Sequence, residues 1–178
     1  MNNRLALIEV GNGVGSAFIS EGEVFRDGAN LAGELGHLTV MPFGNLCSCG
    51  KRGCLETYVT EYALLKESRT IEPINDIHAL YKAARKQESW AQSLLERTAF
   101  FIAVSLNTIV CLYNPDRLIL CGELIQHYPE IVDLVNQYSQ EEVWQPVDTS
   151  AEAVATGLRD EDIILSTGNI ALKSYFLH

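Results

Sequence analysis

The segment from Gly33 to Glu56 constrains the fold of this chain more than any other stretch. It contains one histidine and three of the five cysteines of the sequence, in the order His37, Cys47, Cys49 and Cys54. Three thiolates and one imidazole make a complete tetrahedral set for Zn²⁺, with no coordination position left open for water. Glycines interrupt the segment and let its backbone wrap tightly around a small ion. The spacing therefore predicts a loop that is closed by a structural zinc ion.

Two carboxylates, Glu34 and Glu56, bracket these four predicted ligands. A carboxylate accepts paired hydrogen bonds from neighbouring hydroxyl groups, so both side chains are candidates for holding a polar ligand. The alternative is that they only support the metal ligands or the first turn of a helix. From the residue types alone, both interpretations stay open.

Length and composition predict a single α/β unit in the cytoplasm. A chain of 178 residues can bury one substantial core, either as one domain or as one lobe of a larger domain. No uninterrupted apolar run of about 18 residues is present, so we expect no membrane span, and the N-terminus lacks the apolar segment of a signal peptide. Five cysteines, three of them in a metal pattern, favour a reducing cytoplasmic location over a disulfide scaffold.

The formal net charge of −10 argues against DNA binding by this chain itself. Neutralising DNA phosphates requires a clustered basic surface, and the sequence offers only short basic pairs such as Lys51-Arg52. We therefore expect any contact with DNA to come from a segment that is not part of this chain.

A glycine-rich loop separates two apolar runs near the N-terminus. Leu5–Val10 and residues 16–19 predict a β-hairpin, with 24–26 as a further short strand. The backbone N–H groups of such a loop can approach a phosphate. The spacing matches neither the dinucleotide fingerprint nor a P-loop, so a plain tight turn is the alternative. The glycines in question are Gly11, Gly13 and Gly15.

Helices and two more strands are expected in the rest of the chain. Periodicity and turn residues predict helices over 55–68, 76–86, 89–113, 128–140 and 163–175, and strands over 117–121 and 152–155. Asn75 or Asp76 is expected to cap the second of these helices. Helix 89–113 is apolar nearly all round, which predicts burial on several sides, with Cys111 packed as a buried thiol.

The sequence resembles the ROK family of bacterial sugar-responsive repressors, sugar kinases and uncharacterised reading frames. The run GANLAGELGH (28–37) followed by CSCGKRGCLE (47–56) is similar to the family signature, and NPDRLILCG (114–122) continues it. The resemblance implies an α/β fold, namely the C-terminal lobe of an actin-like (ribonuclease H-like) ATPase fold with an inserted zinc loop. Residues 1–178 are then one lobe, with strand hairpins over 4–41, the zinc loop over 37–56 and a helical and β-α-β remainder over 57–178.

The resemblance also implies a sugar site at the two carboxylates. In the family's sugar kinases the residues that correspond to Glu34, His37 and Glu56 hold hexose hydroxyl groups. A metal-bound imidazole is held rigidly, so its second nitrogen can bond a ligand with a fixed tautomer. No catalytic residue is assigned, because the family's catalytic aspartate and Asp-x-Gly-x-Thr phosphate loop belong to an N-terminal lobe. That lobe, and the winged helix-turn-helix of the family's repressors, are expected to be absent from this chain.

Two departures from the family's kinases favour a regulator over an enzyme. Kinases usually carry Gly-Thr-Gly at the hairpin and Gly-Gly after the buried strand, where this chain has Gly11-Asn12-Gly13 and Gly122-Glu123. Gly11, Gly13, Gly15 and Gly122 are therefore predicted to form a degenerate nucleotide-phosphate loop.

The prediction is the effector-binding and oligomerising part of a ROK-type transcriptional regulator. Its expected effector is a sugar or sugar phosphate, and its expected assembly a homodimer or homotetramer. One alternative is an ATP–Mg²⁺-dependent sugar kinase of the glucokinase or fructokinase kind. Another is a zinc-stabilised α/β fragment without activity.

Overall fold

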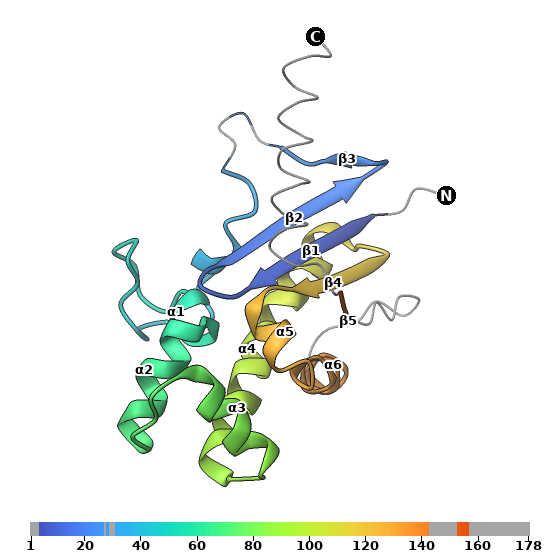
Figure 1. The fold of residues 1–178 in the computed structure, drawn as a ribbon. Coiled ribbons are helices and arrows are strands. Elements are labelled where there is room, and N and C mark those ends of the chain that lie inside the picture. The colour runs from blue at the N-terminus through green and yellow to red at the C-terminus, as the bar shows by residue number, and fades with distance from the viewer. Residues whose placement is uncertain (1–3, 27, 29–30, 143–152, 157–178) are drawn as a thin grey trace, which may run out of the picture.

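A mixed five-stranded sheet forms the centre of the described part of the chain (Figure 1). The computed structural model describes residues 4–26, 28, 31–142 and 153–156. The strand order is β3-β2-β1-β4-β5, with β1 antiparallel to β2 and parallel to β4. The strands are β1 (Leu5–Val10), β2 (Val14–Ser20), β3 (Glu23–Val24), β4 (Arg117–Cys121) and β5 (Ala153–Ala155).

The parallel pairing of β1 with β4 brings two of the predicted glycine positions together. The register runs from Leu5 opposite Arg117 to Glu9 opposite Cys121. Gly11 and Gly122 follow directly after these strand ends, so they meet at the same carboxyl edge of the sheet. Ligands of open α/β sheets bind at this kind of edge.

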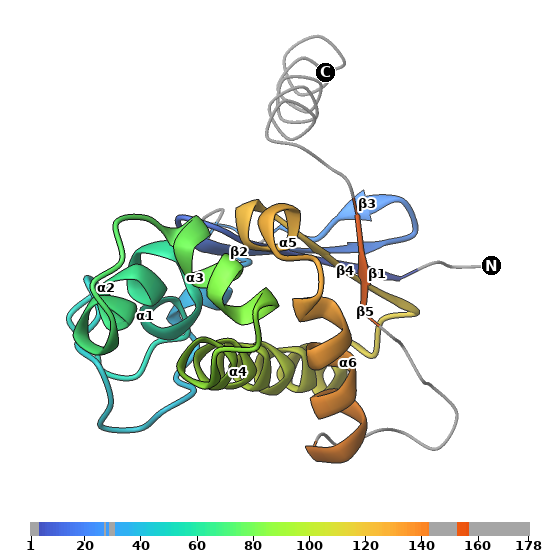
Figure 2. The same ribbon diagram turned by 60° about the horizontal axis from the view of Figure 1, so that its bottom comes forward.

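Two helices, α4 (Ser89–Tyr113) and α6 (Ile131–Glu142), cover one face of the sheet (Figure 2). The core lies between them and the alternate strand residues that point inward, such as Ile8 and Leu120, both fully buried. By length and composition α4 could cross a membrane, but 56% of its most apolar stretch is buried inside the protein. It packs as the central core helix, in agreement with its nearly uniform apolar surface.

The smaller helices gather beyond the carboxyl end of β1 (Figure 1). The backbone N–H of Glu61 donates to the Gly11 carbonyl at 3.2 Å, which fixes this group against the hairpin. Its members are the 3₁₀ turn η1 (Leu35–His37) and the helices α1 (Glu56–Val59), α2 (Glu61–Ile71) and α3 (Ile77–Arg85). A further short helix, α5 (Glu123–His127), follows β4.

Most of the predicted elements are present, with shifted boundaries. The hairpin, helix 89–113 and strand 117–121 are confirmed, and Asp76 caps α3 by accepting a hydrogen bond from Ala79 N at 3.0 Å. The helix predicted over 55–68 is two helices, because Thr60 takes an extended conformation and caps the second one. The helix expected from 128 begins at Ile131, since the separate helix α5 precedes it.

Three further predictions need correction or fall outside the described residues. Cys111 is exposed rather than packed, because it is not among the buried residues of α4, and its thiol donates to Asn107 Oδ1 on the preceding turn at 3.5 Å. The third strand is Glu23–Val24 rather than 24–26. The helix predicted over 163–175 lies outside the residues that the structure describes.

Candidate metal centre

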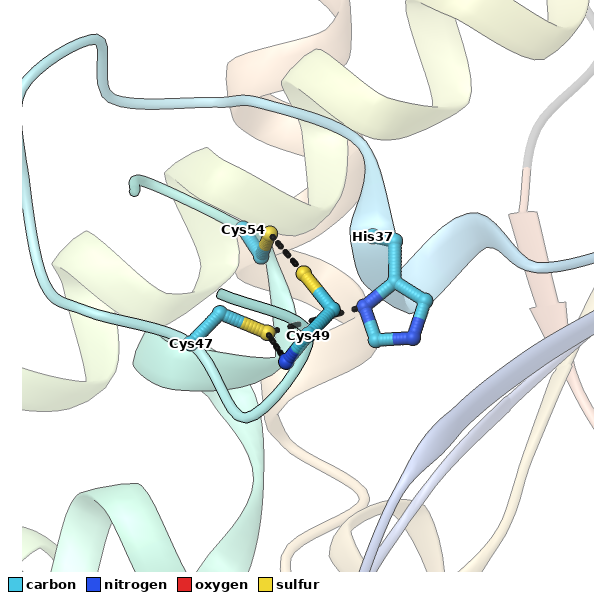
Figure 3. Close-up of side chains that lie close together, drawn as sticks. All are labelled: His37, Cys47, Cys49 and Cys54. Atoms are coloured by element: carbon cyan, nitrogen blue, oxygen red, sulfur yellow. Dashed lines mark hydrogen bonds between the residues drawn. The ribbon is translucent and has the colours of Figure 1, made fainter. Parts of the chain in front are cut away.

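The four predicted ligands converge on one point (Figure 3). The ligand atoms of His37, Cys47, Cys49 and Cys54 all lie within 4.8 Å of one another. Cys49 Sγ is 3.7 Å from Cys54 Sγ, and Cys47 Sγ is 3.6 Å from His37 Nδ1. Among the described residues this is the only group of at least three His, Cys, Asp or Glu side chains that could hold a metal ion.

The spacing of these atoms fits tetrahedral zinc. With bond lengths of about 2.3 Å to sulfur and 2.0–2.1 Å to nitrogen, a tetrahedral site has S···S edges of about 3.8 Å and S···N edges of about 3.5 Å. The observed separations of 3.7 Å and 3.6 Å agree with both edges. Four protein donors also complete the coordination shell, as in structural zinc sites, and leave no position for substrate or water.

Short-range backbone contacts shape the loop that carries the cysteines. The Cys47 N–H donates to the Lys51 carbonyl at 2.8 Å and the Gly50 N–H donates back to the Cys47 carbonyl at 3.0 Å. Gly53 has φ of +81°, and a Cβ there would lie 1.8 Å from the Met41 carbonyl oxygen. Only glycine satisfies both conditions, so Gly53 is required where the loop crosses itself.

Tyr58 fastens this loop to the core helix. Its hydroxyl accepts a hydrogen bond from the Asn45 N–H at 2.7 Å, and its ring packs on that of Phe101 in α4 with centroids 4.8 Å apart. This role of Tyr58 was not predicted from the sequence. Its position just after the last cysteine, on the buried side of a helix, is the only sequence signal that could have suggested this role.

The protonation of the cysteines depends on their surroundings. Burial, together with hydrogen bonds to Cys47 and Cys49, raises the pKa of the Cys54 thiol to about 12. A hydrogen bond to Glu56 raises the pKa of Cys47, whereas the backbone hydrogen bond from Lys51 lowers that of Cys49. Buried thiols of this kind ionise when a divalent cation supplies the compensating charge, so a metal ion fits the chemistry of the donor set.

The two bracketing glutamates are connected to His37 in different ways. Glu34 precedes the 3₁₀ turn, and the His37 N–H donates to its carbonyl at 3.1 Å, so the two side chains are one turn apart. Glu56 begins α1, and its Oε1 lies 3.9 Å from His37 Nδ1. A Cβ on Gly36 would lie 3.6 Å from Glu56 Cβ, which shows how closely the turn packs on α1. Glu56 therefore lies beside His37 in the fold, whereas Glu34 is linked to His37 through the backbone of the turn.

The carboxylates differ in their present partners. Glu56 Oε1 accepts hydrogen bonds from Cys47 Sγ at 2.9 Å and Ser48 Oγ at 3.2 Å. The first of these requires the thiol form of Cys47 and is lost when the thiolate binds a metal ion, whereas the bond from Ser48 does not depend on the metal. Glu34 is exposed, and no hydrogen bond or ion pair engages its side chain within the described part of the chain. His37 directs Nδ1 toward the sulfur atoms, and its other ring nitrogen points away from them (Figure 3).

The four glycines of the predicted phosphate loop differ in their surroundings. Gly11 and Gly122 follow neighbouring strand ends, whereas Gly13 in the hairpin turn and Gly15 in β2 have open space beside them. Asn12 Nδ2 donates to Glu123 Oε2 at 2.9 Å, so a carboxylate lies across the tip of the loop. This contact joins residues that are 111 positions apart.

The family model described as ROK family matches residues 2–171. The chain is 25% identical to the xylose repressor of Bacillus spizizenii over 174 residues, which cover 98% of this chain and 45% of that protein. It is 32% identical over 130 residues to the N-acetylglucosamine repressor of Escherichia coli O157:H7, and the match covers 67% of this chain and 32% of that repressor. It is 26% identical over 180 residues to a glucokinase of Halalkalibacterium halodurans, and the match covers 90% of this chain and 54% of that glucokinase. The chain thus spans about half the length of these relatives, or less.

Solved structures share the fold. A ROK hexokinase from Thermus thermophilus superposes with a TM-score of 0.76 at 23% identity, covering 90% of this chain and 54% of the hexokinase. A ROK family transcriptional regulator, a homologue of the E. coli MLC protein, superposes with a TM-score of 0.77 at 22% identity. The match covers 90% of this chain and 43% of that regulator. The fold class predicted from the sequence is thereby confirmed as an α/β lobe of the actin-like ATPase fold.

The metal cluster predicts one zinc ion per chain. Apparent binding free energies of structural zinc are roughly 10–16 kcal/mol, so removing the ion with a chelator is expected to lower the melting temperature. Cys49→Ser should release zinc and loosen the loop while the helical circular dichroism is retained. Elemental analysis and thermal melts measure both effects.

Cys111→Ser provides the matched control, because Cys111 is an exposed cysteine outside the cluster. This variant should bind zinc and melt as the unaltered chain does. A zinc content well below one per chain, or a melting curve unchanged by chelation, contradicts the assignment.

Proposed function

The chain belongs to the ROK family, and from that premise we propose that it is the sugar-binding part of a sugar-responsive transcriptional regulator. Glu34, His37 and Glu56 would hold the hydroxyl groups of the sugar, and a closed structural Zn²⁺ site would fix the loop that presents them. The observation that supports the sugar site is the placement of Glu56 beside the metal-facing histidine, with Glu56 Oε1 at 3.9 Å from His37 Nδ1, and of Glu34 at the start of the turn that carries this histidine.

Each of the three residues has a distinct part in this proposal. The Glu34 carboxylate has both oxygens available for adjacent sugar hydroxyls, the geometry in which a carboxylate accepts most strongly. His37 offers its outward ring nitrogen, whose tautomer is fixed because Nδ1 is directed at the metal position. Glu56 accepts a hydrogen bond from Ser48 through Oε1, which leaves Oε2 for the ligand.

The contact between Asn12 and Glu123 favours a regulator over a kinase. A Cβ on Gly11 would lie 3.3 Å from Glu123 Oε2, and Asn12 holds the same oxygen at 2.9 Å. This carboxylate lies on the loop that would approach a nucleotide phosphate. Two like charges about 4 Å apart repel by roughly 4 kcal/mol near a protein surface. Glu123 would therefore weaken ATP binding, whereas the proposed sugar contacts would not be affected.

A regulator needs DNA contacts that this chain does not offer by itself. With 13 Lys and Arg against 23 Asp and Glu, its charge disfavours DNA phosphates, so a winged helix-turn-helix elsewhere in the protein would make them. Sugar binding would shift the DNA-binding parts across a cytoplasmic homodimer or homotetramer. Such a shift requires the sugar to bind one arrangement more tightly than the other.

Glu34→Ala tests the sugar site with little effect on folding. Loss of a hydrogen bond to a charged group costs about 1.5–3 kcal/mol, so sugar affinity should fall roughly 10- to 150-fold. Because Glu34 is exposed and supports no other described residue, the free energy of unfolding should not change. Binding is measured by NMR titration with xylose, glucose and N-acetylglucosamine, and stability by urea denaturation.

Glu72→Ala is the control, since Glu72 is an exposed glutamate at the end of α2. It should leave both measurements unchanged. Equal sugar affinity of the Glu34→Ala variant and the unaltered chain would contradict the assignment of Glu34.

The regulator proposal predicts weak nucleotide binding that two substitutions can restore. Asn12→Thr combined with Glu123→Gly removes the carboxylate and returns a hydroxyl to the loop. This variant should bind ADP at least about tenfold more tightly than the unaltered chain, by isothermal titration calorimetry. ATP-dependent phosphorylation of any hexose by the full-length unaltered protein would overturn the regulator and favour the sugar kinase.

A further inference from the structure

A cleft of about 710 Å³ opens beside Glu56, between the metal-binding loop and α2. Its volume lies within the range of roughly 300–1,000 Å³ that is typical of small-molecule sites. Glu56 is part of its wall, whereas Glu34 and His37 are not. The cleft therefore continues outward from the proposed sugar contacts instead of coinciding with them. Neither the metal site nor those contacts account for it.

The lining of this cleft combines hydrogen-bonding groups with one flat apolar surface. Hydroxyl, amide, carboxylate and cationic side chains all contribute to the lining, together with the tyrosine Tyr62 of α2. The polar side chains of the lining include Asn45, Ser48, Glu56, Tyr62, Lys66 and Arg97. Polyhydroxylated ligands need this mixture, because each sugar ring presents hydroxyl groups at its rim and C–H groups on its faces.

Tyr62 supplies the flat surface. The residue is 72% exposed, and within the described part of the chain its ring stacks on no other ring and its hydroxyl bonds to no other group. Lys66 follows four positions later on α2, so the two side chains project from the same face of the helix. A tyrosine ring gives a large rigid contact area at low conformational-entropy cost, with a polar tip that stays hydrated.

The charges in the cleft balance. Arg97 pairs with Glu67 through Nη2 and Oε2 at 2.5 Å, and the other two charged side chains of the lining, Lys66 and Glu56, carry opposite signs. Arg97 Nε is buried and has no acceptor among the described residues. A buried donor of this kind is normally satisfied by a bound water rather than by a ligand in an open cleft. The two carboxylates and two cations of the lining cancel, and a cleft without net charge suits a neutral sugar better than a phosphorylated one.

We infer that this cleft is a second carbohydrate subsite, so that the effector of this chain is a neutral oligosaccharide rather than a monosaccharide. One sugar unit lies at Glu34, His37 and Glu56, and the next extends past Glu56 to stack on Tyr62 within reach of Lys66. The inference rests on the proposed sugar-binding function and names the ligand class of that site. Glu56 is the residue that both units share.

The test compares matched monosaccharides and disaccharides on the zinc-loaded chain. The probes are glucose with cellobiose, xylose with xylobiose, and N-acetylglucosamine with chitobiose, titrated by NMR. For at least one pair the disaccharide should bind at least about tenfold more tightly, which corresponds to 1.4 kcal/mol. Tyr62→Ala should bring the ratio of the two dissociation constants close to one. Ile71→Ala changes an exposed side chain of the same helix outside the cleft and should keep the ratio.

The outcomes separate this inference from the function on which it rests. Equal affinities within all three pairs, or a disaccharide advantage that survives Tyr62→Ala, overturn the second subsite and leave the monosaccharide site in place. Binding of none of the six sugars overturns the proposed function, and the subsite with it.

Discussion

The convergence of four ligands from three separate pieces of chain is the constraint on which the functional surface depends. His37 comes from the turn after the hairpin, Cys47 and Cys49 from a loop, and Cys54 from the residues just before α1. Apart from the metal cluster, residues 38–55 are held by two isolated β-bridges, by backbone hydrogen bonds within the loop and by the Tyr58 anchor. A metal ion at the cluster would therefore set the position of both carboxylates, since each lies within a few residues of a ligand.

The parts of this structure that were predictable from the sequence are those that local signals specify. The spacing of His37, Cys47, Cys49 and Cys54 indicated the metal cluster before any fold was known, because a ligand set of this chemistry has few other uses. Helix α4 and the hairpin followed from apolar periodicity and turn residues. The break at Thr60 was missed, although a threonine that caps a following helix is itself a local signal.

The parts that escaped prediction depend on contacts between distant positions. Glu123 reaches Asn12 only because β1 and β4 pair in parallel and end at the same edge of the sheet. The exposure of Cys111 follows from which stripe of α4 the sheet and α6 cover, and an almost uniformly apolar helix does not specify that stripe. The cleft beside Glu56 likewise combines the loop, α2 and Arg97 of α4, which no single stretch of sequence contains.

The central claim is that the metal ion holds the loop in place and that the carboxylates bind the sugar. Sugar binding with and without zinc tests this claim directly. A sugar that binds the chain is titrated by NMR against zinc-loaded protein and against protein from which zinc has been removed. The account predicts that the zinc-free chain keeps the resonances of the sheet and of α4 but loses at least about tenfold in sugar affinity. Equal affinity of both forms, with the loop resonances changed, would show that the metal does not hold the sugar contacts and would contradict the central claim.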